Sequence, residues 1–113
     1  MMRISTATEL IEDAFGKEEA IRMIARAGFD CADLSLFEME EGYESPFLQE
    51  GYAAYALRLK QVAEECGICF NQAHAPFHSS FPNEEQTKNR FHEIVRAMGS
   101  AALLGAKTIV VHP

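Results

Sequence analysis

Two short apolar runs in this chain each end in a histidine that a proline follows within two residues. Residues 70–76 read FNQAHAP and residues 108–113 read TIVVHP. Proline has no backbone N–H to donate to a β-ladder, so each run is expected to be a strand that stops at its histidine, His74 or His112. Parallel α/β proteins place their chemistry at the carboxyl ends of their strands. The two histidines are therefore the first candidates for a functional site.

The chain as a whole alternates between strand and helix patterns. Strands are predicted at residues 3–8, 31–37, 69–74 and 107–112, and the first is expected to lead into a polar loop. Helices are predicted at residues 16–28, 52–67 and 83–105, each ending at a glycine. Asn83 and Gln86 have the spacing of a capping box at the start of the last helix. That helix is expected to bury an apolar stripe, which consists of Phe91, Ile94, Val95, Met98 and Ala102.

This alternation predicts an α/β fold with a parallel sheet. The strands recur at roughly 30–40 residues, which is the size of a β/α unit, and such crossovers are right-handed. Four strands with three helices on one face fit half of a (β/α)8 barrel. A flavodoxin-like open sheet is the alternative, but it needs a phosphate loop after the first strand, and no glycine-rich segment follows Thr8. Residues 1–113 are therefore interpreted as a single half-barrel domain, completed by oligomerisation or by further sequence.

The composition argues against several classes of partner. The formal net charge of −7 disfavours binding to a nucleic-acid backbone, which needs clustered lysine and arginine. No apolar run approaches the roughly 20 residues of a membrane span, and the first residues lack the apolar stretch of a signal peptide. We therefore expect a cytoplasmic protein with no nucleic-acid or membrane partner.

The chain has three cysteines, an odd number that suits reduced thiols in a cytoplasm. Cys66 and Cys69 form a C-x-x-C pattern, which redox proteins place at a helix N-terminus to stabilise the thiolate. Here Cys66 is expected to close a helix and Cys69 to open a strand. No second pair completes a zinc site, so both are expected to pack in the core.

Three segments resemble the xylose-isomerase-like TIM barrels. They are residues 28–36 (GFDCADLSL), residues 74–77 (HAPF) and residues 103–113 (LLGAKTIVVHP). That superfamily includes sugar-phosphate isomerases and epimerases, inosose dehydratase-like enzymes and apurinic endonucleases of the endonuclease IV type. The resemblance spans the whole chain, which corresponds to strands one to four of the family's eight.

The resemblance implies roles for three residues. His74 and His112 match the histidines after strands three and four, which contact substrate in the sugar isomerases and bind zinc in the endonuclease branch. Asp33 matches the inward acidic position on strand two. The catalytic glutamates and most metal ligands of the family lie on strands five to eight, outside this chain. Residues 78–82 (HSSFP) lack the Asn-Leu segment usual in the endonucleases, which favours the sugar-isomerase branch.

His74 and His112 are thus the candidate catalytic residues and a candidate partial metal site. Adjacent strands lie about 4.8 Å apart, so the two imidazoles can converge. The alternative is that each only bonds a nearby carbonyl at the end of its strand. Asp33, Glu38 and Glu9 are the candidates for substrate binding, although acidic loop residues are usually just solvated. The two remaining histidines, His78 and His92, are expected to face solvent.

The leading interpretation is a sugar or sugar-phosphate isomerase or epimerase module, incomplete because its carboxylate base is missing. A divalent metal (Mn, Mg or Zn) would polarise the carbonyl and hydroxyl groups of the sugar. One alternative is a fragment of an endonuclease IV-like, zinc-dependent DNA repair nuclease, which would need a basic groove. Another is a non-catalytic half-barrel for binding or assembly. Open strand edges, and an inner face expected to expose Phe70 and Val110, predict a homodimer or higher oligomer.

Overall fold

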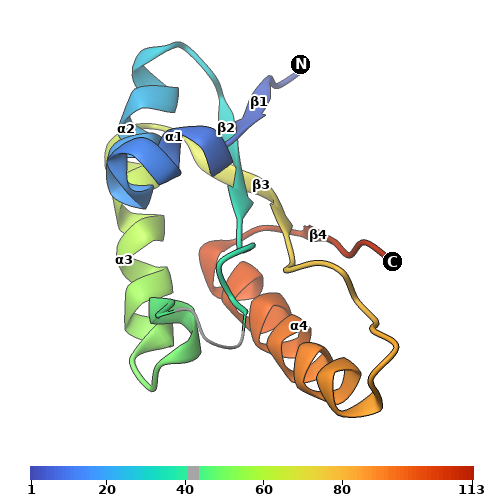
Figure 1. Ribbon diagram of the computed structural model, residues 1–113. Helices are drawn as coiled ribbons and strands as arrows, with labels where there is room; N and C mark the ends of the chain where they lie inside the picture. Colours follow the sequence, from blue (N-terminus) through green and yellow to red (C-terminus); the bar gives the residue numbers. More distant parts are fainter. Residues whose placement is uncertain (41–43) are drawn as a thin grey trace.

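The computed structural model of the chain describes residues 1–40 and 44–113, and they form one parallel sheet covered on one face by helices (Figure 1). The strands are β1 (Ser5–Ala7), β2 (Cys31–Ser35), β3 (Cys69–His74) and β4 (Thr108–Val110), in the order β1-β2-β3-β4. The helices are α1 (Glu9–Phe15), α2 (Lys17–Arg26), α3 (Tyr52–Glu65) and α4 (Glu84–Leu104), with a 3-10 turn η1 (Pro46–Leu48) before α3. This confirms the predicted α/β half-barrel.

The core lies between the sheet and the helices α2, α3 and α4. Each of these helices follows a strand and returns to the next one in parallel, which puts all three on the same side of the sheet (Figure 1). Large buried side chains come from the sheet and from the helices; they include Ile21 and Ile24 of α2, Leu34 of β2, Leu59 and Val62 of α3, Phe70 of β3, Phe47 of η1 and Leu104 of α4. No helix among the described residues is both long and apolar enough to cross a membrane.

Residues 9–15, predicted as a polar loop, form the helix α1 instead. The Thr8 carbonyl accepts hydrogen bonds from the backbone N–H groups of Ile11 and Glu12, and Glu9 and Glu12 lie in the first turn, where the helix dipole favours acids. Gly16, with φ of +82°, separates α1 from α2. The first turn of α1 therefore lies directly after β1, at the carboxyl end of the sheet.

The helix α4 begins as predicted, because the side chain of Asn83 accepts a hydrogen bond from the Gln86 N–H. Its buried face is a different one from the predicted stripe. Only Ile94 of the predicted residues is buried, whereas Phe91, Val95 and Met98 are about half exposed or more. The buried face is made of smaller and polar side chains: Arg90, Glu93, Ile94, Ala97, Ser100, Ala101 and Leu104. Small residues let α4 pack closely on α3, which leaves the bulkier apolar stripe on the outside.

A β-bulge in β3 decides which of its side chains face the open side of the sheet. Ala32 pairs with Phe70 but Asp33 pairs with Gln72, so Asn71 is an extra residue on β3. Phe70 therefore lies in the core, only 3% exposed, and does not line the inner face as predicted. After the bulge the alternation is reversed, and His74 shares the inner face with Asp33.

Candidate functional site

His74 and Asp33 form a hydrogen-bonded pair on the open face of the sheet, at the carboxyl end. His74 Nδ1 lies 2.9 Å from Asp33 Oδ1, and Gln72 Nε2 donates to Asp33 Oδ2 at 2.8 Å. An ionised carboxylate only accepts hydrogen bonds, so the proton of a neutral His74 belongs on Nδ1 and the lone pair on Nε2. The pair is largely buried, with 22% of the His74 side chain and 13% of the Asp33 side chain exposed. Asp33 thus fixes both the orientation and the tautomer of His74.

His112 lies directly beside His74, so the structure brings the two candidate histidines together. Their ring centroids are 5.6 Å apart and their planes differ by 17°. The segment that carries His112 is held in place by backbone bonds, because the Ala75 N–H donates to the Val110 carbonyl and the Ser79 N–H to the His112 carbonyl. The pair is therefore positioned by two adjacent strand ends and the segment that follows β3.

Two phenylalanines border the histidines. The ring of Phe37 meets His74 edge-to-face at 5.9 Å, and the ring of Phe77 meets His112 at 5.3 Å. Phe37 and Phe77 also contact each other at 4.7 Å. Phe77 remains 41% exposed. The histidines therefore lie beside a partly exposed apolar surface formed by the two rings. Such a surface can pack against the C–H groups of a small polar ligand.

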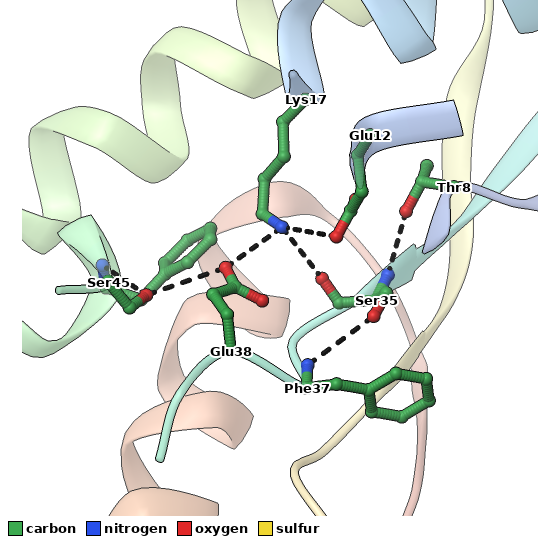
Figure 2. A network of polar contacts seen from close by, with 8 residues as sticks. Thr8, Glu12, Lys17, Ser35, Phe37, Glu38 and Ser45 are labelled. Atoms are coloured by element: carbon green, nitrogen blue, oxygen red, sulfur yellow. Dashed lines mark hydrogen bonds and ion pairs between the residues drawn. The ribbon is translucent and has the colours of Figure 1, made fainter. Parts of the chain in front are cut away.

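Glu38, one of the candidates for substrate binding, lies in a separate buried cluster centred on Lys17 (Figure 2). Lys17 Nζ is 2.7 Å from Glu12 Oε1, 2.9 Å from Glu38 Oε1 and 3.2 Å from the Ser35 carbonyl oxygen. Only 9% of the Lys17 side chain and 7% of the Glu12 side chain are exposed. Glu12 Oε2 and Glu38 Oε2 are buried too, and neither meets a hydrogen-bond partner in residues 1–40 and 44–113. One lysine is therefore shared by the buried carboxyl group of Glu12 and the partly buried one of Glu38, whose side chain is 29% exposed.

The protonation equilibria of this cluster follow from its burial. Desolvation raises the pKa of Glu12, and the opposing attraction of Lys17 does not cancel it. Desolvation works to lower the pKa of Lys17, but the combined attraction of Glu38 and Glu12 outweighs it and the pKa of Lys17 is raised. Lys17 is therefore held as a cation, whereas burial favours the protonated form of Glu12.

A shallow acidic cavity of about 230 Å³ opens next to this cluster. Glu9, the remaining substrate-binding candidate, is exposed on α1 and lines the cavity together with Glu38. The complete lining consists of Glu9, Glu12, Asp13, Ser35, Phe37, Glu38 and Glu40. The candidates from the sequence thus fall into two neighbouring groups, with Asp33, His74 and His112 in one and Glu9 and Glu38 in the other.

Sequence reasoning did not identify Lys17, Glu12 or Gln72 as members of these groups. Lys17 did carry a signal, because it is the first residue of α2, where the helix dipole disfavours a cation and favours acids. A lysine in that place needs a compensating anion. Gln72 carried no comparable signal, since its contact with Asp33 depends on the bulge in β3.

The other two histidines lie outside the two groups. His92 is exposed on α4, as predicted. His78 is also exposed, and its Nδ1 is 3.2 Å from the Pro113 carbonyl oxygen.

His74 has one feature that metal-binding histidines share, but the described residues do not assemble a metal site. A histidine whose other ring nitrogen is held by a carboxylate is the usual arrangement of a metal-binding histidine, and His74 has it through Asp33. However, within residues 1–40 and 44–113 no three His, Cys, Asp or Glu side chains are placed to hold one ion. Any metal held by His74 and His112 would need further ligands from outside these residues.

Comparisons with known proteins support the fold. No family model and no curated protein matches the sequence. Among solved structures, the chain is similar to a crystal structure of D-psicose 3-epimerase determined in the presence of D-fructose, with a TM-score of 0.64 and 16% sequence identity. The match covers 96% of this chain and 36% of that one, so this chain spans about a third of the length of the epimerase. The chain therefore has the fold of the N-terminal half of a TIM barrel, similar in structure to part of a sugar epimerase.

Proposed function

We propose that this chain supplies the N-terminal half of a sugar isomerase or epimerase site. The observation that supports this most directly is the Asp33–His74 pair at the carboxyl end of β3, with His112 beside it. This end of the strands is where TIM-barrel enzymes bind their substrates. The likeness to a TIM-barrel epimerase agrees with the proposal but does not by itself carry it.

In this proposal His74 and His112 bind and orient the sugar. His74 Nε2 accepts a hydrogen bond from a sugar hydroxyl or takes up its proton, while Asp33 stabilises the imidazolium that would form. Phe37 and Phe77 pack against the C–H face of the sugar. A divalent cation held in part by the two histidines would polarise the carbonyl of the sugar when bound. Both carboxylate oxygens of Asp33 are engaged with His74 and Gln72, so a carbon-bound proton would have to be removed by a group outside the Asp33, His74 and His112 cluster.

The acidic cavity favours a neutral sugar over a sugar phosphate. Its lining contains five carboxyl side chains, those of Glu9, Glu12, Asp13, Glu38 and Glu40. The other two lining residues are Ser35 and Phe37. A phosphate dianion in this part of the mouth would be repelled. The same acidity opposes a DNA backbone, so nothing here favours the nuclease alternative.

The binding role predicts a selective response of the histidines to a ketose. Adding D-fructose to the ¹⁵N-labelled chain should shift the imidazole signals of His74 and His112 and leave those of the exposed His92 unchanged. Mn²⁺ should broaden the same two signals, because it is paramagnetic. Long-range ¹H–¹⁵N NMR spectra of the imidazoles measure both effects. The variant Asp33→Asn should lose the Nδ1–H tautomer of His74 and weaken both responses. Equal shifts at His92, or no shift at His74 and His112, would contradict the proposal.

We also propose that a second copy of the chain completes the barrel. Both β1 and β4 are edge strands, with unpaired backbone groups along one side. Bulky apolar side chains are exposed at both ends of the half-barrel; they are Ile4, Leu10 and Phe15 near β1, and Phe91, Val95 and Met98 on α4. A two-fold axis along the barrel would bring β4 of one copy next to β1 of the other and cover both apolar surfaces.

This association predicts a dimer at micromolar concentration, measured by sedimentation. The double substitution Val95→Glu and Met98→Glu should yield a folded monomer, because it places charges in the proposed contact. Leu57→Glu is the matched control, since Leu57 is equally exposed (50%) but lies on the middle helix α3, and this variant should remain dimeric. A stable, well-folded monomer of the unmodified chain would show that the rest of the barrel is supplied in another way. The cytoplasmic location remains a prediction.

A further inference from the structure

Cys31 and Cys69 face each other across adjacent strands at the amino end of the sheet. They are register partners of β2 and β3, and their Sγ atoms are 3.2 Å apart. Both thiols are free. The C-x-x-C pattern suggested Cys66 as the neighbour of Cys69, but the sulfur in contact with Cys69 is that of Cys31.

The backbone geometry permits a direct bond between these two sulfurs. A disulfide needs Cα atoms about 4.4–6.8 Å apart. Neighbouring strands of a sheet are separated by about 4.7–4.9 Å, and register partners on the same face point the same way. The sulfurs therefore need only small side-chain rotations to reach bonding distance, with no movement of the strands.

The two thiols differ in access and in environment. Cys31 is 1% exposed, and burial raises the pKa of its thiol. Cys69 is partly exposed and lines an open cavity of about 330 Å³ together with Arg3 and Asp30. The Arg3 guanidinium donates to Cys69 Sγ at 3.8 Å, so a cationic donor lies beside this sulfur. Cys69 is thus the accessible nucleophile, and Cys31 is the buried partner behind it.

We propose that Cys31 and Cys69 are a peroxide-reactive pair that closes to a disulfide across β2 and β3. The Cys69 thiolate attacks one oxygen of hydrogen peroxide, the O–O bond breaks, and the released hydroxide takes up a proton to become water. The resulting sulfenic acid at Cys69 is then attacked by the sulfur of Cys31. The S–O bond breaks and hydroxide leaves. This hydroxide takes up the proton of the Cys31 thiol and becomes the second molecule of water. Two thiols lose two electrons in total, and the peroxide gains them.

The pair lies at the opposite end of the strands from the histidines. Cys31 and Cys69 begin β2 and β3, whereas Ser35 and His74 end them. The disulfide would therefore join the two strands without entering the proposed sugar site. This inference is independent of the proposed function, and the imidazole signals of His74 and His112 should be the same in the reduced and the oxidised chain.

The test is to treat the reduced, folded chain with stoichiometric hydrogen peroxide, alkylate the remaining thiols and map the peptides by mass spectrometry. We expect an intramolecular Cys31–Cys69 disulfide, with Cys66 remaining a thiol that is alkylated. Cys66→Ser should form the same crosslink and serves as the matched control. Cys31→Ser should instead accumulate a sulfenic acid at Cys69, which dimedone traps. A Cys66–Cys69 crosslink, disulfides only between chains, or thiol loss no faster than in urea would each overturn the proposal.

Discussion

Replacing Lys17 with methionine is expected to destabilise the chain by about 3–5 kcal/mol, because it leaves the buried Glu12 carboxyl and the partly buried Glu38 carboxyl without their shared cation. Glu12 and Glu38 both bind Lys17 Nζ, and each already has one buried oxygen that meets no hydrogen-bond partner in the described part of the chain. A loss of that size is a large part of the free energy of unfolding of a typical domain, which is about 5–15 kcal/mol. Urea unfolding followed by circular dichroism measures it.

The matched control is Lys60→Met, because Lys60 forms an exposed ion pair with Glu64 at 3.9 Å. Such pairs contribute about 0–1 kcal/mol, so this variant should unfold nearly like the unmodified chain. If Lys17→Met were no more destabilising than Lys60→Met, the buried cluster would not have the role assigned to it.

The effect of Lys17→Met should also depend on pH in a defined direction. The pKa of Glu12 in the folded chain is raised above 4.5, so the protonated form is favoured by folding. The stability that this provides is fully present below pH 4.5 and is lost as the pH rises through the raised value. Without Lys17 the ionised form of Glu12 destabilises the folded chain further, because the cation beside it has been removed. The difference between the variant and the unmodified chain should therefore shrink as the pH falls from 7 toward 4. A difference independent of pH would contradict this account.

Replacing Arg90 with methionine is the second change with a large expected effect, again about 3–5 kcal/mol. Only 7% of the Arg90 side chain is exposed, and its Nε donates to Glu93 Oε2 at 2.7 Å. The guanidinium also donates to the His78 carbonyl and lies 5.0 Å from the centroid of the Phe81 ring. Arg90 thus connects the segment between β3 and α4 to the helix α4. Its replacement would also remove the ion-pair partner of the buried Glu93.

Two further variants separate these causes. Lys88→Met on the same helix is the control, since Lys88 is 70% exposed, and it should change the free energy of unfolding by less than about 1 kcal/mol. Combining Arg90→Met with Glu93→Leu should recover much of the loss, because an apolar pair can replace a buried ion pair at little cost. Residues 75–82 should become more sensitive to proteolysis in both Arg90 variants. No recovery in the double variant would mean that the contacts to His78 and Phe81 dominate.

The positions of most elements were predictable because they depend on local chemistry. Gly28, Gly67 and Gly105 follow the helices α2, α3 and α4 and take positive φ, which glycine adopts without strain. The start of α4 follows from the side chain of Asn83, which needs only the N–H three residues later. Even the meeting of His74 and His112 was predictable, although β4 ends at Val110 and not at His112 as predicted. His74 ends β3, and His112 follows the end of the neighbouring parallel strand by two residues.

The buried face of α4 was not predictable from hydrophobicity alone. The helix carries two stripes, and the bulkier one, with Phe91, Val95 and Met98, is the stronger hydrophobic signal. Packing against α3 instead selects the face with Ala97 and Ala101, because close approach of two helices needs small side chains. The buried face of α4 is therefore decided by how α3 and α4 pack together, and the sequence of α4 alone does not reveal it.

The sequence by itself determined the order of strands and helices and the placement of two histidines at strand ends, because both follow from residues close together in the chain. Only the tertiary structure decided what those histidines contact. The bulge at Asn71 turns Gln72 and His74 toward Asp33 and places Phe70 in the core. A strand pattern with a strict period of two would put Phe70 and His74 on the same face. The extra residue arises from pairing with β2, about 40 residues earlier, and no local pattern in β3 records it.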